Sequence, residues 1–263
     1  MADILARMTQ ITADYDDQTA LDAIDLDLPE GKVIAFCGPN GSGKSTALRV
    51  LRGLHRPSAG AASVAGRPLT DWEPRALARE IAMLSQSPEA PDEMSVADLA
   101  MMGRFSHRSR FSAPSAADHA TVERALKATG MTTLADRALG HLSGGQLQRA
   151  WIAMTLAQDS PRIFLDEPTN HLDIAHALEV LDLVVRLNRS EHRSFVLVLH
   201  DLNLAMRYAD EVVLFRQGRI AAQGPTEAVM TSETIGSVFE IDCDVVTVAS
   251  GERFIMSRSR AKP

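Results

Sequence analysis

Nine consecutive residues decide the fold of this chain: Gly38-Pro39-Asn40-Gly41-Ser42-Gly43-Lys44-Ser45-Thr46. They match the pattern G-x-x-x-x-G-K-[ST], a loop that binds phosphate when it lies between a strand and a helix. The apolar run at 33–37 predicts a buried strand before the loop, and residues 46–51 predict a helix after it, which Gly53 can end. The strand and the helix that the motif needs on either side are thus both predicted. We call these nine residues the phosphate loop and expect them to bind phosphate.

The residue types in the phosphate loop suit this chemistry. Glycines let backbone N–H groups wrap an anion, because a Cβ atom would block the close approach. The start of the following helix adds a partial positive charge. Lys44 can reach the outer phosphates, and the hydroxyl of Ser45 can hold Mg²⁺. The alternative is a glycine-rich turn that binds nothing, which the match at every fixed position disfavours.

The composition narrows the class of partner. Of 263 residues, 45% are hydrophobic and 23% charged, which is ordinary for a globular protein of one large domain or two lobes. The net charge of −7 argues against nucleic acid as a partner, since no global positive field attracts it. No apolar stretch approaches the roughly 18 residues that span a bilayer, and the N-terminus lacks a secretory signal. We expect a cytoplasmic protein that reaches a membrane only through a partner.

The two cysteines, Cys37 and Cys243, lie far apart and lack metal-ligand spacing. Cys37 ends a buried strand and is expected to be a small core residue. We expect no disulfide in a reducing compartment.

Hydrophobic patterns predict an α/β fold. Residues 24–28 alternate strictly between apolar and acidic, which indicates a strand with one buried face, and a turn at 29–31 follows. Near-continuous apolar strands that alternate with helices predict a mainly parallel sheet covered on both faces. We expect strands at 163–165, 195–199, 211–215 and 244–248, and helices at 95–102, 117–129, 174–187 and 202–208.

The expected organisation is one domain, 1–263, with three parts. Residues 1–86 and 160–225 are expected to form the core that carries the phosphate loop, with a β-rich N-terminal part. Residues 87–159 form an inserted α-helical lobe, and residues 226–263 form a C-terminal extension.

Two carboxylates follow the strand expected at 163–165. In nucleotide hydrolases with such a phosphate loop, the acid at this strand end holds Mg²⁺, a role that suits Asp166. Glu167, one residue later, could orient or deprotonate the attacking water. The alternative is a strand that stops at two solvated acids, and the presence of a phosphate loop makes it the weaker one.

His200 follows the strand expected at 195–199. This places it at the sheet edge where ligands of open α/β sheets bind, with the phosphate loop and the carboxylates. A neutral imidazole there can bond a phosphate oxygen or the attacking water. His200 can equally be a hydrogen-bonded residue at a helix start, with Asp201 as the N-cap. Position alone leaves both interpretations open.

A second candidate anion site, the serine–glycine segment, precedes an apolar helix expected at 147–156: Leu142-Ser143-Gly144-Gly145-Gln146. Ser143 and Gln146 fit a capping box, which indicates a well-made helix start. Paired glycines at the positive end of a helix could also bind an anion. Spacing does not decide between these two functions.

Three further features are ambiguous in isolation. Gln86 could sense the γ-phosphate or the metal, although an exposed glutamine is the better interpretation. Tyr15 could stack on adenine or be a half-buried strand residue. The basic run at 104–111 is interpreted as a solvated loop rather than a nucleic-acid site. Histidines without shared ligand spacing are assigned to structure or surface: His55, His119, His141, His171, His176 and His192.

Together these motifs resemble those of an ABC-type ATPase, the nucleotide-binding subunit of an ATP-binding-cassette transporter, and they follow the family's order from about residue 11 to 246. The resemblance implies that residues 1–86 and 160–225 form a P-loop NTPase core, which binds ATP and Mg²⁺ and includes an N-terminal antiparallel β subdomain. It identifies the phosphate loop as Walker A, residues 163–167 as Walker B with its glutamate, and residues 142–146 as the LSGGQ motif. It implies that nucleotide binds to Tyr15, Gly38, Pro39, Asn40, Gly41, Ser42, Gly43, Lys44, Ser45 and Thr46.

The resemblance also implies the remaining roles. Catalysis is assigned to Glu167, His200, Lys44 and Gln86, and Mg²⁺ to Ser45, Gln86 and Asp166. The segment 170–173 occupies the position of the D-loop. The nucleotide of a partner copy would be contacted by Leu142, Ser143, Gly144, Gly145, Gln146 and Asp173. This predicts a head-to-tail homodimer with two ATP molecules between the chains.

A narrower resemblance concerns the cargo. Residues 103–107, 151–154 and 200–208 are similar to stretches in the ATPases of ferric-siderophore importers, with haem and cobalamin importers as near relatives. Three residues depart from the family pattern: Leu147, which is often basic, Arg162, at a usually apolar position, and Ser106, where proline is usual. The resemblance implies a permease partner, an indirect contact with a substrate-binding protein, and a place on the cytoplasmic face of the inner membrane.

Functions of two other classes are weighed against transport. The first is a non-transport ATPase of the same family. Chromosome-type relatives carry a long coiled coil and translation-type relatives carry two cassettes, and neither feature is present here, so a cluster-assembly ATPase is the remaining alternative of this class. The second is an ATP-binding scaffold without turnover.

Overall fold

The computed structural model describes residues 4–258 except 87, 110–111, 171 and 250. Ser87, where the helical lobe was expected to begin, His171, and Arg110-Phe111 of the basic run therefore lie outside the described residues. The chain divides into two compact units. The first unit comprises residues 1–71 and 196–263, and the second comprises residues 72–195. The sequence placed boundaries at 86/87 and 159/160 instead, and those boundaries stay a prediction.

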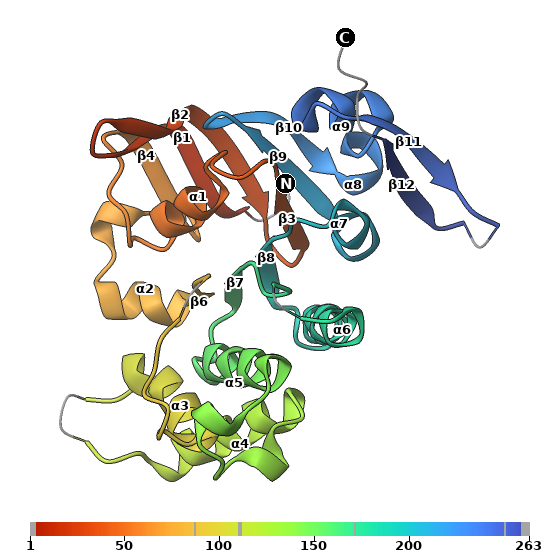
Figure 1. The fold of residues 1–263 in the computed structure, drawn as a ribbon. Coiled ribbons are helices and arrows are strands. Elements are labelled where there is room, and N and C mark those ends of the chain that lie inside the picture. Colours follow the sequence, from red (N-terminus) through yellow and green to blue (C-terminus); the bar gives the residue numbers. More distant parts are fainter. Residues whose placement is uncertain (1–3, 87, 110–111, 171, 250, 259–263) are drawn as a thin grey trace. The chain divides into compact units, whose positions relative to one another are not determined.

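The first unit contains a four-stranded antiparallel sheet with the order β2-β1-β4-β5 (Figure 1). In β2 the side chains of Ile24, Leu26 and Leu28 are buried and the acids between them are exposed, so the predicted alternation is confirmed. The strands of this sheet are β1 (Ile4–Tyr15), β2 (Gln18–Pro29), β4 (Ala59–Val64) and β5 (Arg67–Pro68), and a 3-10 turn, η1 (Leu69–Asp71), follows.

The same unit holds the strand that carries the phosphate loop. β3 (Val33–Cys37) is buried along its whole length and pairs in parallel with β9 (Glu211–Arg216). The rings of Phe36 and Phe215, one from each strand, lie 5.0 Å apart and are fully buried. β9 pairs in turn with antiparallel β10 (Arg219–Pro225), a strand that the sequence did not predict.

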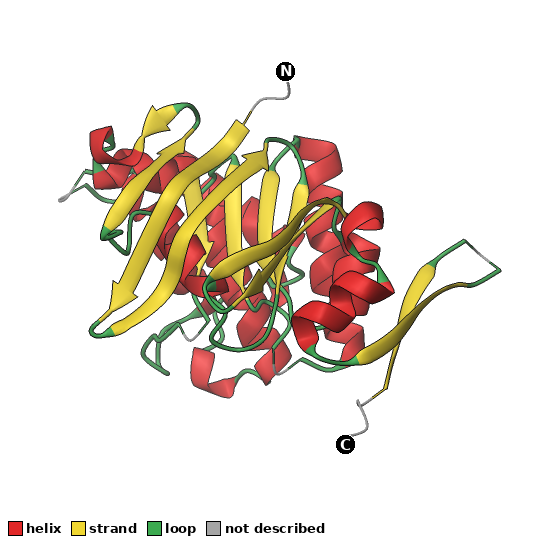
Figure 2. Ribbon diagram, turned by 90° about the horizontal axis from the view of Figure 1, so that it is seen from above, coloured by secondary structure: helices red, strands yellow, loops and turns green. Residues whose placement is uncertain are grey.

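Helices and a hairpin complete the first unit. Its helices are α1 (Lys44–Leu51), α7 (Leu202–Tyr208), α8 (Thr226–Val229) and α9 (Ser232–Phe239). Near the C-terminus, β11 (Asp242–Thr247) and β12 (Arg253–Arg258) form a separate two-stranded sheet, visible as an isolated pair of strands in Figure 2. The N–H of Ile255 donates to the side-chain oxygen of Asn203 in α7 at 2.7 Å, which fixes this hairpin to α7.

The second unit is mainly helical. Its strands β6 (Ile81–Leu84) and β7 (Arg162–Asp166) pair in parallel. Helices α3, α4 and α5 pack against one another (Figure 1). The helices are α2 (Pro74–Glu80), α3 (Val96–Met102), α4 (Ala116–Ala128), α5 (Gly144–Ala157) and α6 (Ile174–Glu191), with 3-10 turns η2 (Gly103–Ser106), η3 (Thr132–Leu134) and η4 (Leu139–His141). β8 (Ser194–Val198) carries the chain from the second unit into the first.

The fold class expected from the sequence is confirmed: a P-loop NTPase fold with a mainly parallel sheet, an N-terminal antiparallel β subdomain and a helical lobe. Helix starts follow their capping residues. Ser95, Ser115, Asp173 and Asp201 each accept a backbone N–H bond at the start of a helix. Within the described residues, every helix is too short or too polar to cross a membrane.

Candidate nucleotide-binding site

The phosphate loop joins β3 to α1 in the first unit, and two of its glycines are required by close contacts. A Cβ atom at Gly38 would lie 2.2 Å from the carbonyl oxygen of Phe215, and one at Gly43 would lie 2.6 Å from that of Ala20. Both residues also have positive φ angles, of 151° and 104°. Only glycine fits such positions, so the sequence of the loop follows from its path.

Lys44 begins α1, two residues earlier than the sequence predicted for the helix. Its side chain is buried, and Nζ donates hydrogen bonds to the carbonyl oxygens of Gly38 and Pro39, both at 2.9 Å. The ammonium group is thus held over the first residues of its own loop. At Cys37, burial raises the pKa of the thiol to about 12, so this cysteine is an inert core residue, as expected, and both cysteines are free.

The C-terminal extension reaches the phosphate loop. A pocket of about 280 Å³ is lined on one side by residues 39–42 and on the other by residues 216–217 and 238–240. Arg216 bonds Glu240 at 2.5 Å, so an ion pair joins the end of β9 to the residue that follows α9. The extension therefore contributes to the surroundings of the loop.

Tyr15 ends β1 and is 39% exposed. The ring lies 4.4 Å from that of His55 at an angle of 37°, and its hydroxyl accepts a bond of 3.2 Å from Arg49. His55, which the sequence assigned to structure or surface, is therefore the aromatic neighbour of the candidate adenine-stacking residue. The adenine contact itself stays a prediction.

His200 lies in the same unit as the phosphate loop. The N–H of Leu199 bonds the carbonyl of Phe36 at 3.1 Å, which brings the end of β8 beside the end of β3. His200 is exposed at this point. Asp201 caps α7 by accepting bonds from two backbone N–H groups, so the predicted N-cap is confirmed. A contact between His200 and phosphate stays a prediction.

The second unit brings together two residues that the sequence could relate only through the family. Nε2 of Gln86 donates to Oε2 of Glu167 at 2.8 Å, and the side-chain amide of Asn170 donates to the same oxygen. Glu167 has a φ of 58°, an uncommon conformation for a residue with a Cβ and one that is often found at functional sites. Asn170 is a partner of Glu167 that the sequence analysis missed. Asp166, at the buried end of β7, is only 1% exposed.

The serine–glycine segment starts α5 with the predicted capping box. The hydroxyl of Ser143 accepts the N–H of Gln146 at 3.3 Å, and the side-chain oxygen of Gln146 accepts the N–H of Ser143 at 3.0 Å. Ser143 and Gly144 are exposed. The structural interpretation is thus confirmed, and the anion-binding interpretation, which is compatible with it, stays a prediction.

Asp173 caps α6. Its Oδ1 accepts the backbone N–H of His176 at 2.9 Å and lies 2.8 Å from Nδ1 of the same residue. These hydrogen bonds lower the pKa of Asp173 below its usual range and keep the carboxylate charged. Lys44, Ser45 and His200 belong to the first unit, and the other predicted catalytic, metal-binding and partner-contacting side chains belong to the second.

The basic run at 104–111 is not a fully solvated loop. Residues 103–106 form η2, and the side chain of Arg104 is buried. Arg104 donates to Asp118 at 2.9 Å and to the carbonyl of Ala157 at 2.9 Å, while Nε2 of His107 bonds the carbonyl of Gln158. This arginine joins η2 to α4 and α5 within the lobe. The sequence missed this role because its anionic partner lies outside the run.

We expect Arg104→Ala to lower the free energy of unfolding by about 3 kcal/mol, because it leaves the buried carboxylate of Asp118 without its ion-pair partner. Denaturant unfolding measures this change. The control is Arg7→Ala, which breaks an ion pair that is half exposed on both sides and should have a smaller effect. Equal effects of the two variants would contradict the assigned role.

The stability that this pair provides depends on pH. Hydrogen bonds from Ser115, followed by the bond from Arg104, lower the pKa of Asp118. Above the ordinary aspartate pKa of about 4, the lowered pKa of Asp118 in the folded protein contributes its full stabilisation of the folded state. As the pH falls through the pKa that Asp118 has in the folded protein, this stabilisation is lost.

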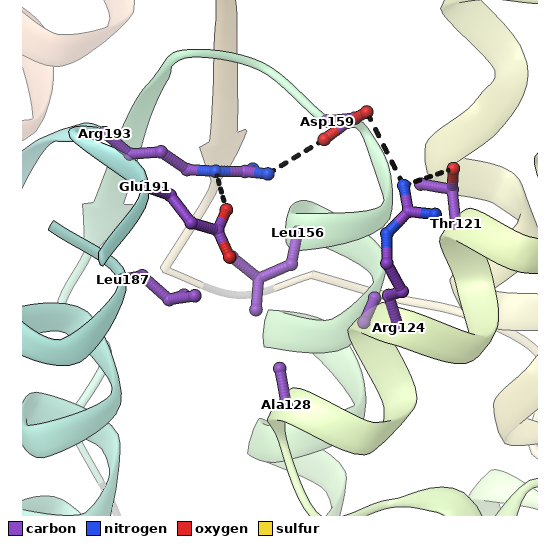
Figure 3. A pocket seen from close by; sticks show the side chains of 9 residues that line it. Thr121, Arg124, Ala128, Leu156, Asp159, Leu187, Glu191 and Arg193 are labelled. Carbon is purple, nitrogen blue, oxygen red and sulfur yellow. Dashed lines mark hydrogen bonds and ion pairs between the residues drawn. The ribbon is translucent and has the colours of Figure 1, made fainter.

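A separate pocket of about 190 Å³ lies in the second unit (Figure 3). Arg193 bonds Asp159 at 2.8 Å and Glu191 at 2.6 Å, and Arg124 lies 4.0 Å from Asp159. The charges at this pocket therefore pair with one another. The pocket is lined by Thr121, Arg124, Ala125, Ala128, Leu156, Asp159, Leu187, Glu191 and Arg193, none of which the sequence singled out for nucleotide binding.

Comparisons with known proteins agree with this geometry. The model of the family "ABC transporter" matches residues 21–170, more than half of the chain. The chain belongs to the ABC transporter family. Within that family it is an ATP-binding subunit, an ABC-type ATPase coupled to transport.

Two curated relatives and one solved structure illustrate the similarity. The Probable siderophore transport system ATP-binding protein of Bacillus subtilis is 46% identical over 231 residues, which cover 88% of this chain and 84% of the relative. The Petrobactin import ATP-binding protein of Bacillus anthracis is 43% identical over 238 residues, which cover 90% of this chain and 87% of the relative. A chain from a transporter described as of the metal-chelate type, in an inward-facing conformation, matches with a TM-score of 0.85 at 28% identity over 98% of both chains.

Proposed function

We propose that this chain hydrolyses ATP to drive the uptake of an iron chelate, specifically a ferric siderophore, through a membrane permease. The observation that carries the proposal is the similarity to siderophore-import ATPases over nearly the full length of both chains. The siderophore-type stretch at 103–107 supports it. A permease would hold the chain at the cytoplasmic face of the inner membrane, and a substrate-binding protein would deliver the chelate to that permease.

The active form is a head-to-tail dimer with two ATP molecules between the chains. The phosphate loop of one copy holds a triphosphate through its N–H groups and Lys44, and the exposed Ser143 and Gly144 of the other copy complete the site. Closure depends on ATP because the triphosphate bridges the two copies. Hydrolysis removes the bridge and shifts the population towards the open dimer.

Within each site the residues have distinct roles. Glu167 acts on the attacking water, and Gln86 and Asn170 hold its carboxylate in position. His200 assists at the γ-phosphate. Oxygen ligands are those that Mg²⁺ prefers, and the Ser45 hydroxyl, the Asp166 carboxylate and the Gln86 amide oxygen fit this requirement. When bound, the ion neutralises charge on the phosphates.

The cargo is tested by ATPase activity in vesicles that contain the permease and the binding protein. We expect ferric siderophores to stimulate phosphate release several-fold, with iron-free siderophores as the control. Stimulation by haem or cobalamin and not by ferric siderophores would contradict the cargo assignment. Failure to co-purify with any permease from detergent would favour the cluster-assembly alternative instead. ATP binding without phosphate release under all conditions would indicate a scaffold.

A further inference from the structure

The proposed dimer places two parts of the second unit at the partner's nucleotide: the serine–glycine segment and Asp173. The side chain of His176, in the first turn of α6, contacts both of them. The sequence assigned it to structure or surface because it shares no ligand spacing with another histidine. It lies three residues after Asp173, and in space it lies against Gly145 of the serine–glycine segment.

The contacts are specific on both sides of the ring. Nδ1 lies 2.8 Å from Oδ1 of Asp173, and since a carboxylate only accepts hydrogen bonds, Nδ1 carries the proton. On the other side, a Cβ atom built on Gly145 would lie 3.2 Å from Cγ of the ring and 3.4 Å from Cδ2 and Nδ1. The ring therefore packs closely over the glycine, and even a methyl group there would require it to shift.

A hydrogen bond also ties α5 to the chain between β7 and α6. Nε2 of Gln148 in α5 donates to the carbonyl of Pro168 at 3.0 Å, immediately after Glu167. Both contacts join the start of α5 to the chain from β7 to α6, and an ion pair of 2.6 Å between Arg149 and Glu179 further links α5 to α6. Of these two contacts, only that of His176 reaches both Asp173 and a residue of the serine–glycine segment.

We propose that His176 is a positioning residue that holds Asp173 and the serine–glycine segment in a fixed relation, so that both meet the partner's triphosphate together. The proposal rests on the head-to-tail dimer of the proposed function. In this role His176 contacts neither the phosphate nor the attacking water. Its loss should therefore weaken productive ATP binding across the dimer and leave the chemical step nearly unchanged.

The first test separates KM from kcat. We expect His176→Ala to raise KM for ATP about five-fold with kcat changed by less than about two-fold, because it removes binding rather than transition-state interactions. His176→Asn should restore KM, since the asparagine Cγ, Nδ2 and Oδ1 can occupy the places of the ring atoms that contact Asp173 and Gly145. His119→Ala, at an exposed histidine of α4, is the control. An unchanged KM in His176→Ala, or equal changes in the alanine and asparagine variants, would overturn the proposal.

The second test asks on which chain His176 acts. Two differently tagged copies, both carrying Glu167→Gln to prevent turnover, are co-purified as a mixed dimer, and the Kd of radiolabelled ATP with Mg²⁺ is measured. Lys44→Ala on one copy leaves a single competent phosphate loop, that of the other copy. His176→Ala is then placed either on the copy with Lys44→Ala or on its partner.

The two arrangements contain the same substitutions and differ only in which site they affect. With both substitutions on one copy, the intact phosphate loop faces the altered segment, and we expect Kd to rise about five-fold. With the substitutions on opposite copies, the intact loop faces an unaltered segment, and we expect the parental Kd. Equal Kd values in the two arrangements would overturn the role of His176.

A second pair of mixed dimers carries Ser143→Ala in place of His176→Ala. It shows which claim is wrong if the two arrangements of His176→Ala have equal Kd values. If the Kd for ATP differs between the two arrangements for Ser143→Ala but not for His176→Ala, the positioning role is wrong and the head-to-tail dimer stands. If the Kd is the same in both arrangements for both substitutions, the head-to-tail dimer is wrong as well.

Discussion

Glu167→Gln is expected to lower the rate of ATP hydrolysis by about a thousand-fold while ATP binding persists. A positioned general base contributes 10²- to 10⁴-fold to such a step, and an amide cannot take the proton of the water. The substitution conserves shape, because an amide oxygen can still accept the bonds that Gln86 and Asn170 donate to the carboxylate. Because ATP is bound and not consumed, the dimer closed on two nucleotides should accumulate. Phosphate release, ATP binding and size-exclusion chromatography measure the three effects.

The control for this variant is Glu123→Gln, which changes an exposed glutamate of α4 in the same unit and should leave hydrolysis unchanged. Hydrolysis in Glu167→Gln above about a tenth of the parental rate would remove Glu167 from its role. A loss of ATP binding in this variant would also contradict the proposal, since Glu167 is assigned to the water and not to the nucleotide.

Lys44→Ala is expected to weaken ATP binding about a hundred-fold. Its ammonium group is buried at the start of α1 and contacts the carbonyl groups of Gly38 and Pro39, where an outer phosphate would meet it. Charge-assisted hydrogen bonds to phosphate are among the stronger polar interactions, and the expected loss corresponds to about 2.7 kcal/mol.

Equilibrium titration with a fluorescent ATP analogue measures this loss. Lys32→Ala is the matched control, because Lys32 is an exposed lysine that immediately precedes β3 in the same unit. Unchanged affinity in Lys44→Ala would show that the loop does not bind phosphate through its lysine. The folded state of the variant is checked by its unfolding transition.

Much of the fold followed from local patterns in the sequence. The apolar run of β3, the alternation of β2 and the capping residues Ser143 and Asp201 all act within a few residues of one another. Several strands were not predicted as individual elements, and two of them, β10 and β12, carry short or broken apolar patterns. They are strands because β9 and β11 offer them partners along their length. Such pairing is a tertiary effect that a local pattern does not reveal.

The candidate site was predictable in its residue types and less so in its contacts. The carboxylates after β7 and the loop after β3 were found from strand ends and glycine spacing. The contact of Gln86 with Glu167 joins residues 81 positions apart, and the ring of His176 over Gly145 depends on how α6 meets α5. Arg104 was misread for the same reason, since its buried partner Asp118 lies on another helix.

The most direct measurement is a crystal structure of the Glu167→Gln variant with ATP and Mg²⁺. We expect two copies in a head-to-tail arrangement, with each triphosphate in contact with Lys44 of one copy and Ser143 of the other. A structure in which Lys44 and Ser143 of a single copy clasp the same triphosphate, or in which Ser143 contacts no nucleotide, would contradict the shared site.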